Sequence, residues 1–159
     1  MNPTLTTPQR AALKTAIQAD GTANTLYVDG NLDGLAAHLN ANASPAFTVW
    51  KTLVAVGDVG KTFVASELAG LTQLNTSRLQ NLAAWLAAGV NPSLASIRQF
   101  FDDIFSGAGG ANTRAALLVL WKRPASRVER VFATGTGSDA SPGLIVSEGP
   151  ITTTELIGL

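Results

Sequence analysis

The segment Ala55–Thr62 has the residue types and spacing of a permissive phosphate-binding loop, in which alanine replaces the first glycine. In such a loop, backbone N–H groups surround a phosphate, Lys61 reaches the terminal phosphate and Thr62 binds magnesium. This chemistry requires a preceding strand, a long following helix and a parallel sheet. Gly70 interrupts the following helix within about two turns, and the chain has too few strand-like runs for a parallel sheet. We therefore interpret the motif as a chance match in a loop and keep a small nucleotide-binding protein as a further alternative.

Other side chains that could support catalysis do not form a recognisable constellation. His38 is the only histidine and cysteine is absent, which excludes histidine clusters and thiolate sites. We expect His38 to lie on a helix surface or to be partly buried. Asp102 and Asp103 are adjacent and point about 100° apart on a helix, so they do not share a site. Asp29 and Asp33 fit a turn or cap role. We predict no catalytic, cofactor-binding or metal-binding residue and no enzymatic activity.

Basic residues gather in the segment that ends at residue 130. They are Arg114, Lys122, Arg123, Arg127 and Arg130. Arg123, Arg127 and Arg130 recur at i, i+4 and i+7, so they share one face of any helix that continues past Pro124. Three interpretations stay open. The residues form a solvated helix face, or they contact an acidic surface of a neighbouring protein or another copy, or they contact a phosphate backbone.

The composition narrows the class of partner. The chain has 159 residues, of which 46% are hydrophobic and 14% charged, and its 11 basic residues balance its 11 acidic residues. This length suits one domain of ordinary size. A net charge of zero argues against a generic nucleic-acid binder. The low share of charged residues favours burial against neighbouring proteins. Residues 1–19 lack a basic start followed by an apolar core, so we expect no signal peptide. No apolar run is long enough to span a membrane, so we expect no membrane partner.

Hydrophobic spacing and capping residues predict a mainly α fold, a compact bundle of short helices with an extended or β-hairpin C-terminal arm. The expected helices lie near residues 8–20, 32–39, 45–54, 75–88, 92–106 and 113–132. Glycines restrict the segment between 56 and 74 to one-turn helices. Pro124 predicts a kink, or two abutting helices, in the last of these segments.

The composition changes at residue 134, and we predict a helical domain over residues 1–133 and an arm over residues 134–159. The arm begins with a stretch rich in glycine, threonine and serine. Its apolar residues need cover; they are Leu144, Ile145, Val146 and Ile151. Such a run can add a strand to a sheet edge of a partner, or fold back as a hairpin on its own domain. The five basic and four apolar residues together are the predicted partner interface.

Several segments resemble a family of small proteins encoded in the structural-gene modules of tailed bacteriophages. Together they cover about half of the chain and are Leu5–Ile17, Leu35–Lys51, Thr113–Leu117, Arg127–Gly137, Ala140–Pro142 and Glu148–Thr152. The pieces Phe-Ala-Thr-Gly-Thr-Gly and Glu-Gly-Pro-Ile-Thr are the most specific. Pro124 departs from the uninterrupted basic helix of the family, and Ala55–Thr62 is not a shared feature.

The resemblance implies a virion protein without catalytic residues. We expect a non-enzymatic structural protein of the head–tail connector or neck that forms an oligomeric ring, assembles in the cytoplasm of the host bacterium and stays in the virion. Its partners would be copies of itself and other virion proteins, with incidental contact to packaged DNA. The alternative is a tail-assembly chaperone or another minor tail or assembly protein.

Overall fold

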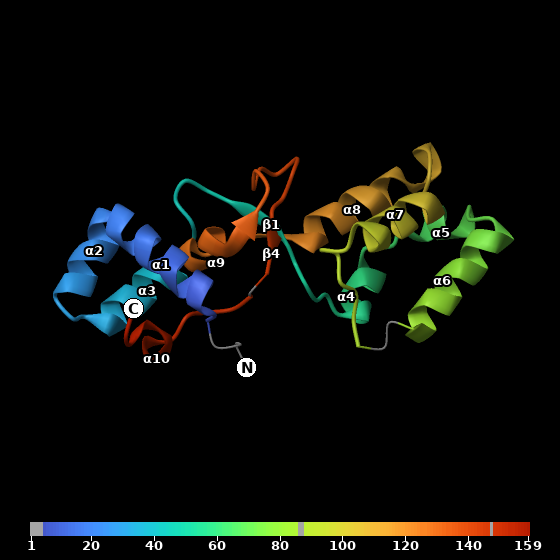
Figure 1. The fold of residues 1–159 in the computed structure, drawn as a ribbon. Coiled ribbons are helices and arrows are strands. Elements are labelled where there is room, and N and C mark those ends of the chain that lie inside the picture. Colours follow the sequence, from blue (N-terminus) through green and yellow to red (C-terminus); the bar gives the residue numbers. More distant parts are fainter. Residues whose placement is uncertain (1–4, 86–87, 147) are drawn as a thin grey trace. The chain divides into compact units, whose positions relative to one another are not determined.

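The computed structural model describes residues 5–85, 88–146 and 148–159, and these residues form two compact units. We call Met1–Val49 with Pro124–Leu159 the terminal unit, and Trp50–Arg123 the central unit. Short helices dominate both, so the predicted mainly α fold is confirmed (Figure 1). None of the helices in the described part of the chain is long and apolar enough to cross a membrane.

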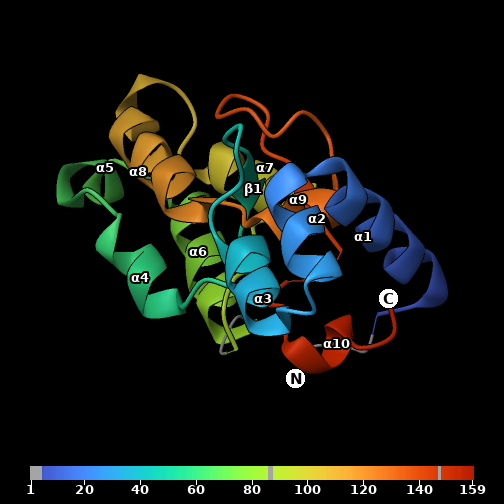
Figure 2. The same ribbon diagram turned by 90° about the vertical axis from the view of Figure 1, so that its left-hand side faces the viewer.

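The helices of the terminal unit begin at polar capping residues. They are α1 (Thr7–Ala19), α2 (Gly21–Val28), α3 (Leu32–Asn40), α9 (Arg127–Phe132) and α10 (Thr153–Leu156). Asp20 caps α2, Asn31 caps α3 and Ser126 caps α9, because each side-chain oxygen accepts a free N–H of the first turn. The helices α1, α2 and α3 pack in sequence, and α10 lies against α3 (Figure 2).

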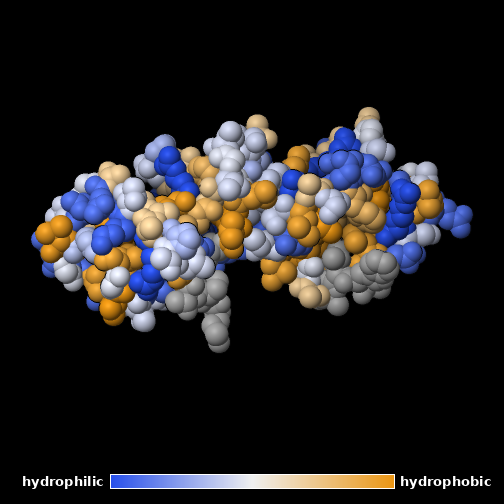
Figure 3. All heavy atoms as spheres, viewed as in Figure 1, coloured by the Kyte–Doolittle hydropathy of each residue, from blue (hydrophilic) through white to orange (hydrophobic). Residues whose placement is uncertain are grey.

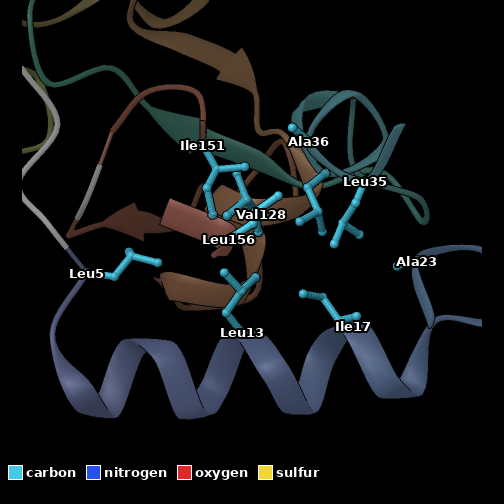
Figure 4. Packing of buried hydrophobic residues seen from close by; sticks show 10 residues of the cluster. Leu5, Leu13, Ile17, Ala23, Leu35, Ala36, Val128, Ile151 and Leu156 are labelled. Carbon is cyan, nitrogen blue, oxygen red and sulfur yellow. The ribbon is translucent and has the colours of Figure 1, made fainter. Parts of the chain in front are cut away.

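Both ends of the chain contribute to the main core of the terminal unit (Figure 4). Leu13 and Ile17 of α1 pack with Leu35 of α3, and all three are buried. Ile151 and Leu156, from the C-terminal segment, complete the same cluster. The core therefore requires residues that are more than a hundred positions apart.

A second, smaller cluster of the terminal unit lies beneath a β-hairpin. Strands β3 (Ala133–Thr134) and β4 (Leu144–Ile145) pair antiparallel, with Ala133 opposite Ile145. Ile145 packs with Val49 and Ala125, and Phe47 covers the cluster. The C-terminal segment is thus a hairpin folded back on its own unit, which is one of the two arrangements left open by the sequence.

The compact units divide the chain differently from the predicted boundary between residues 133 and 134. The arm of residues 134–159 belongs with residues 1–49, because its buried side chains fill the core beneath α1 and α3. The predicted helical domain of residues 1–133 is itself shared between the two units, since residues 50–123 form a unit of their own.

The central unit contains the remaining helices. They are α4 (Val56–Lys61), α5 (Ala65–Ala69), α6 (Gln73–Trp85), α7 (Ala95–Ile104) and α8 (Ala111–Trp121), with a 3-10 turn at Ala108–Gly110. The short helices expected between 56 and 74 are present as α4 and α5. The helix expected over 75–88 is described only to Trp85, and residues 86–87 lie outside the described residues. Phe101 and Trp121 meet edge to face, with ring centroids 5.4 Å apart, at the centre of the core.

A buried carboxylate joins two helices of the central unit. Glu67 of α5 accepts the N–H groups of Asn112 at 3.0 Å and Thr113 at 2.8 Å, in the first turn of α8. Hydrogen bonding to Thr113 is the main cause that lowers the pKa of Glu67. The negative charge lies where the helix dipole favours it.

The helix expected over 113–132 is not continuous. It ends at Trp121, residues 122–124 form strand β2 (Lys122–Pro124), and α9 begins at Arg127. Pro124 lacks a backbone N–H and cannot continue a helix, so the interruption has the predicted cause. The helix expected over 45–54 is wrong, because Thr48–Trp50 forms strand β1, paired with β2.

Candidate partner-binding site

One carboxylate contacts three helices of the terminal unit. Asp20 lies between α1 and α2, and its Oδ1 accepts the N–H groups of Thr22 and Ala23, each at 3.0 Å. Its Oδ2 lies 3.0 Å from Nε2 of His38 on α3 and 3.4 Å from a guanidinium nitrogen of Arg127 on α9. His38 is partly buried, as predicted. The sequence analysis missed Asp20, although its place before Gly21 is the pattern of a helix cap.

Hydrogen bonding lowers the pKa of Asp20 below its ordinary value of 3.8, chiefly through the N–H of Ala23 and then through His38. A lowered pKa in the folded state stabilises the fold above the unfolded-state pKa, and this contribution is lost as the pH falls through the folded-state pKa. The contribution of the Asp20 charge is therefore complete near neutral pH and disappears in acid.

We expect Asp20→Asn to lower the urea midpoint of unfolding at pH 7, and the difference from wild type to shrink as the pH falls below 3.8. Asparagine keeps the capping oxygen, so the substitution removes the charge and preserves the cap. Urea titrations followed by circular dichroism measure both effects. The control is Asp102→Asn, at an exposed aspartate of the central unit. A wild-type–variant difference that stays constant from pH 7 to pH 3 would contradict the prediction.

A groove of about 470 Å³ opens beside Asp20 on the terminal unit. Its lining comes from the end of α1, the end of α3, the loop that follows α3, and α9. The lining residues are Ala16, Ala19, Asp20, Leu39, Ala43, Ser44, Arg127, Arg130 and Val131. The walls are mostly small apolar side chains, and the charged groups on the α9 side are arginines. Such a lining suits an apolar side chain next to a carboxylate.

The two arginines of the groove keep unused hydrogen-bond donors. Nε of Arg127 is buried and has no hydrogen-bond partner among the residues that the structure describes. Arg130 donates one hydrogen bond to the carbonyl oxygen of Pro45 at 3.2 Å, and its guanidinium lies 5.9 Å from the ring centroid of Phe47. A guanidinium has five N–H donors in a planar fork that matches a carboxylate. An anionic group that binds in the groove would therefore compete with only one hydrogen bond of Arg130, the bond to Pro45.

The other basic residues of the predicted interface do not line this groove. Arg114 of α8 donates to the carbonyl oxygen of Phe105, inside the central unit. Lys122 and Arg123 are half-buried in β2. The common face expected for Arg123, Arg127 and Arg130 is not formed, because no helix joins them. Within the terminal unit, Arg127 and Arg130 line the same groove.

The apolar residues of the predicted interface divide into buried and exposed pairs. Ile145 and Ile151 are buried in the two clusters of the terminal unit. Leu144 is 44% exposed and Val146 is 78% exposed. Alternation along the strand explains the difference, because successive side chains point to opposite faces. Leu144 and Val146 are the pair that remains accessible to a partner.

Two polar side chains fasten the segment that carries Ile151. Asn40 exchanges two hydrogen bonds with the backbone of Ile151, accepting its N–H at 2.8 Å and donating to its carbonyl at 2.9 Å. Glu129 is buried and accepts the N–H of Gly149 at 3.2 Å. The sequence analysis missed both residues. Ser126 and Glu129 form a capping box that the spacing could have revealed, whereas Asn40 gives no local signal.

The segment Ala55–Thr62 does not form a phosphate loop. Its residues 56–61 are the helix α4, and the N–H groups of Asp58 and Val59 bond to the carbonyl of Ala55. Lys61 is paired with Asp58 at 2.7 Å. The N–H groups of Asp58 and Val59 and the ammonium group of Lys61 are therefore already bonded within α4.

Within the described ranges, no group of three or more histidine, cysteine, aspartate or glutamate residues is placed to hold a metal ion. Comparisons with protein-family models, with curated proteins and with solved structures find no match to the chain.

Proposed function

We propose that the chain is a non-enzymatic structural protein of a bacteriophage virion, present as a ring in the head–tail connector or neck. This proposal is supported most by where the segments that resemble phage structural-module proteins lie in the fold. With the exception of Trp50–Lys51 and Thr113–Leu117, all of them lie in the terminal unit. The resemblance therefore follows one compact unit rather than scattered pieces of chain.

The resembling segments also supply the parts of the terminal unit that a partner would meet. Arg127–Gly137 contains the two groove arginines and strand β3, and Leu5–Ile17 contains Ala16 of the groove wall. Glu148–Thr152 contains the backbone that Asn40 holds in place. A virion component needs surfaces that have the same conformation in every copy. The hydrogen bonds from Asn40 fix the backbone of Ile151 in one conformation, as such a surface requires.

In the proposed ring, copies of the chain and other virion proteins contact the groove arginines and the exposed Leu144 and Val146. Contact with packaged DNA is incidental. Hydrophilic and hydrophobic residues are interspersed on the viewed face of the terminal unit (Figure 3). Interspersed contacts of this kind are usual in protein–protein interfaces, whose overall apolar share is close to that of ordinary surface.

Quantitative mass spectrometry of purified phage particles tests the proposal. We expect the chain to be retained in particles at a fixed low copy number relative to the major capsid protein, and to remain after high-salt washing. Its presence in infected cells together with its absence from purified particles would overturn the virion assignment and favour the alternative, a tail-assembly chaperone or another assembly factor.

A further inference from the structure

The groove of the terminal unit has an excess of positive charge and an apolar wall. Arg127 and Arg130 line the groove together with a single carboxylate, Asp20, whose oxygens already accept from backbone N–H groups and lie against His38 and Arg127. Arg130 is exposed and donates to the carbonyl oxygen of Pro45, which leaves most of the five N–H donors of its guanidinium available within the described residues. A ligand that matches both the arginines and the apolar wall of this groove carries a carboxylate next to a small or medium-sized apolar side chain.

The α2–α3 corner of the same unit carries this combination; we define it as Val28, Asp29, Gly30 and Asp33. Val28 is 74% exposed, and Asp29 and Asp33 are exposed. No ion pair is formed by either aspartate in the part of the chain that the structure describes. Of the large apolar side chains that are exposed there, Val28 is the one followed directly by an exposed aspartate.

The corner is held in one conformation. Gly30 has φ of 68°, a left-handed value that favours glycine, and its N–H bonds to the carbonyl of Tyr27 at 3.2 Å. The N–H of Asn31 bonds to the carbonyl of Leu26 at 2.9 Å. A corner fixed by these bonds loses little conformational entropy when it binds.

We propose that the groove binds the α2–α3 corner of a second copy of this chain. Val28 packs against the alanine wall formed by Ala16 and Ala19, and the carboxylate of Asp29 accepts hydrogen bonds from Arg130. This inference rests on the proposed ring and names the surfaces that form it. Groove and corner are different patches of one unit, so the contact is head to tail, the type of contact that generates rings when the rotation closes.

A DNA backbone fits the groove less well than the corner does. DNA binding relies on several lysines or arginines that replace counterions along a continuous line of phosphates. The groove has two arginines, a carboxylate of its own and a wall of alanine. A single carboxylate with an adjacent apolar group matches that lining better than a row of phosphates does.

Sedimentation velocity of the full-length chain tests the contact with two complementary variants. Arg130→Glu disables the groove and leaves the corner intact, whereas Val28→Ser combined with Asp29→Ser disables the corner and leaves the groove intact. We expect wild type to form oligomers. Each variant alone is expected to associate at least about tenfold more weakly than wild type, and a tenfold loss corresponds to about 1.4 kcal/mol. An equimolar mixture of the two variants retains one working groove and one working corner per pair of chains, so it forms dimers and nothing larger.

The control is Lys14→Glu, an exposed charge reversal on α1 away from the groove lining, which leaves association unchanged. Circular dichroism checks that each variant is folded. Monomeric wild type at the highest soluble concentration, a mixture that stays monomeric, or variants that associate like wild type would each overturn the inference. Loss of binding to a random DNA duplex by Arg130→Glu with unchanged self-association would assign the groove to nucleic acid instead. None of these outcomes depends on the particle mass spectrometry that tests the proposed function.

Discussion

Gly137→Ala is expected to lower the free energy of unfolding of the terminal unit by about 2–5 kcal/mol, the combined range for left-handed strain and overpacking. Gly137 has φ of 65°, which alanine adopts only at a cost. A Cβ added there would lie 2.2 Å from Cδ2 of Phe47, too close for any side chain. The loop cannot move away easily, because the carbonyl of Gly137 accepts the N–H of Thr48 at 2.7 Å.

Gly30→Ala is a matched control for this prediction. Gly30 has φ of 68°, almost the same as Gly137, but an added Cβ meets nothing within 4 Å. The control therefore carries the backbone strain without the collision. Native-state hydrogen exchange of amides in α1 and α3 measures both losses in the terminal unit itself. Equal losses for the two variants would show that Phe47 does not pack on Gly137 as described.

Leu156→Ala is expected to destabilise the terminal unit by about 2–5 kcal/mol, the usual cost of removing a buried leucine side chain. Leu156 is 1% exposed and packs in the main core with residues of α1 and α3. Truncation leaves a cavity between α10 and the rest of the core, and the C-terminal segment loses its strongest apolar anchor.

The adjacent Ile157→Ala provides the control, because Ile157 is 62% exposed. Its truncation is expected to change stability by less than about 0.5 kcal/mol. Hydrogen exchange in the terminal unit gives the stability of both variants, and limited proteolysis reports release of the C-terminal segment. If the two substitutions had the same small effect, the segment would not be packed into its own unit in solution.

Local signals in the sequence predict the fold class and many helix ends. Thr7-Pro8 marks the start of α1, Asn31 marks the start of α3, and Pro124 interrupts the basic segment as expected. The helix expected near residues 8–20 ends at Ala19, but the sequence did not predict that α2 begins at Gly21, where the side chain of Asp20 provides the cap. Each of these features depends on residues within one turn of one another.

The candidate site depends on contacts that no local pattern contains. Asp20 meets Arg127, and Asn40 meets Ile151, across more than a hundred residues of chain. The basic segment indicated the arginines, but only the fold shows that Arg127 and Arg130 line one groove of the terminal unit. Similarly, the sequence shows that the C-terminal arm has apolar residues, but it does not show which of its side chains are buried. Packing in the terminal unit buries Ile145 and Ile151 and leaves Leu144 and Val146 exposed.

Because the terminal unit combines residues 5–49 with residues that follow position 123, it cannot be completed until those later residues have been synthesised. Residues 5–49 are synthesised before the central unit, whereas the side chains of α9 and α10 that close their core follow it. At about 5–20 residues per second, this leaves the first helices waiting for several seconds while the central unit is synthesised. A copy that is released early lacks Arg127 and Arg130, and with them the groove. Only copies that extend through α9 then present the groove, so a product that ends before Arg127 could not receive the α2–α3 corner of the next copy.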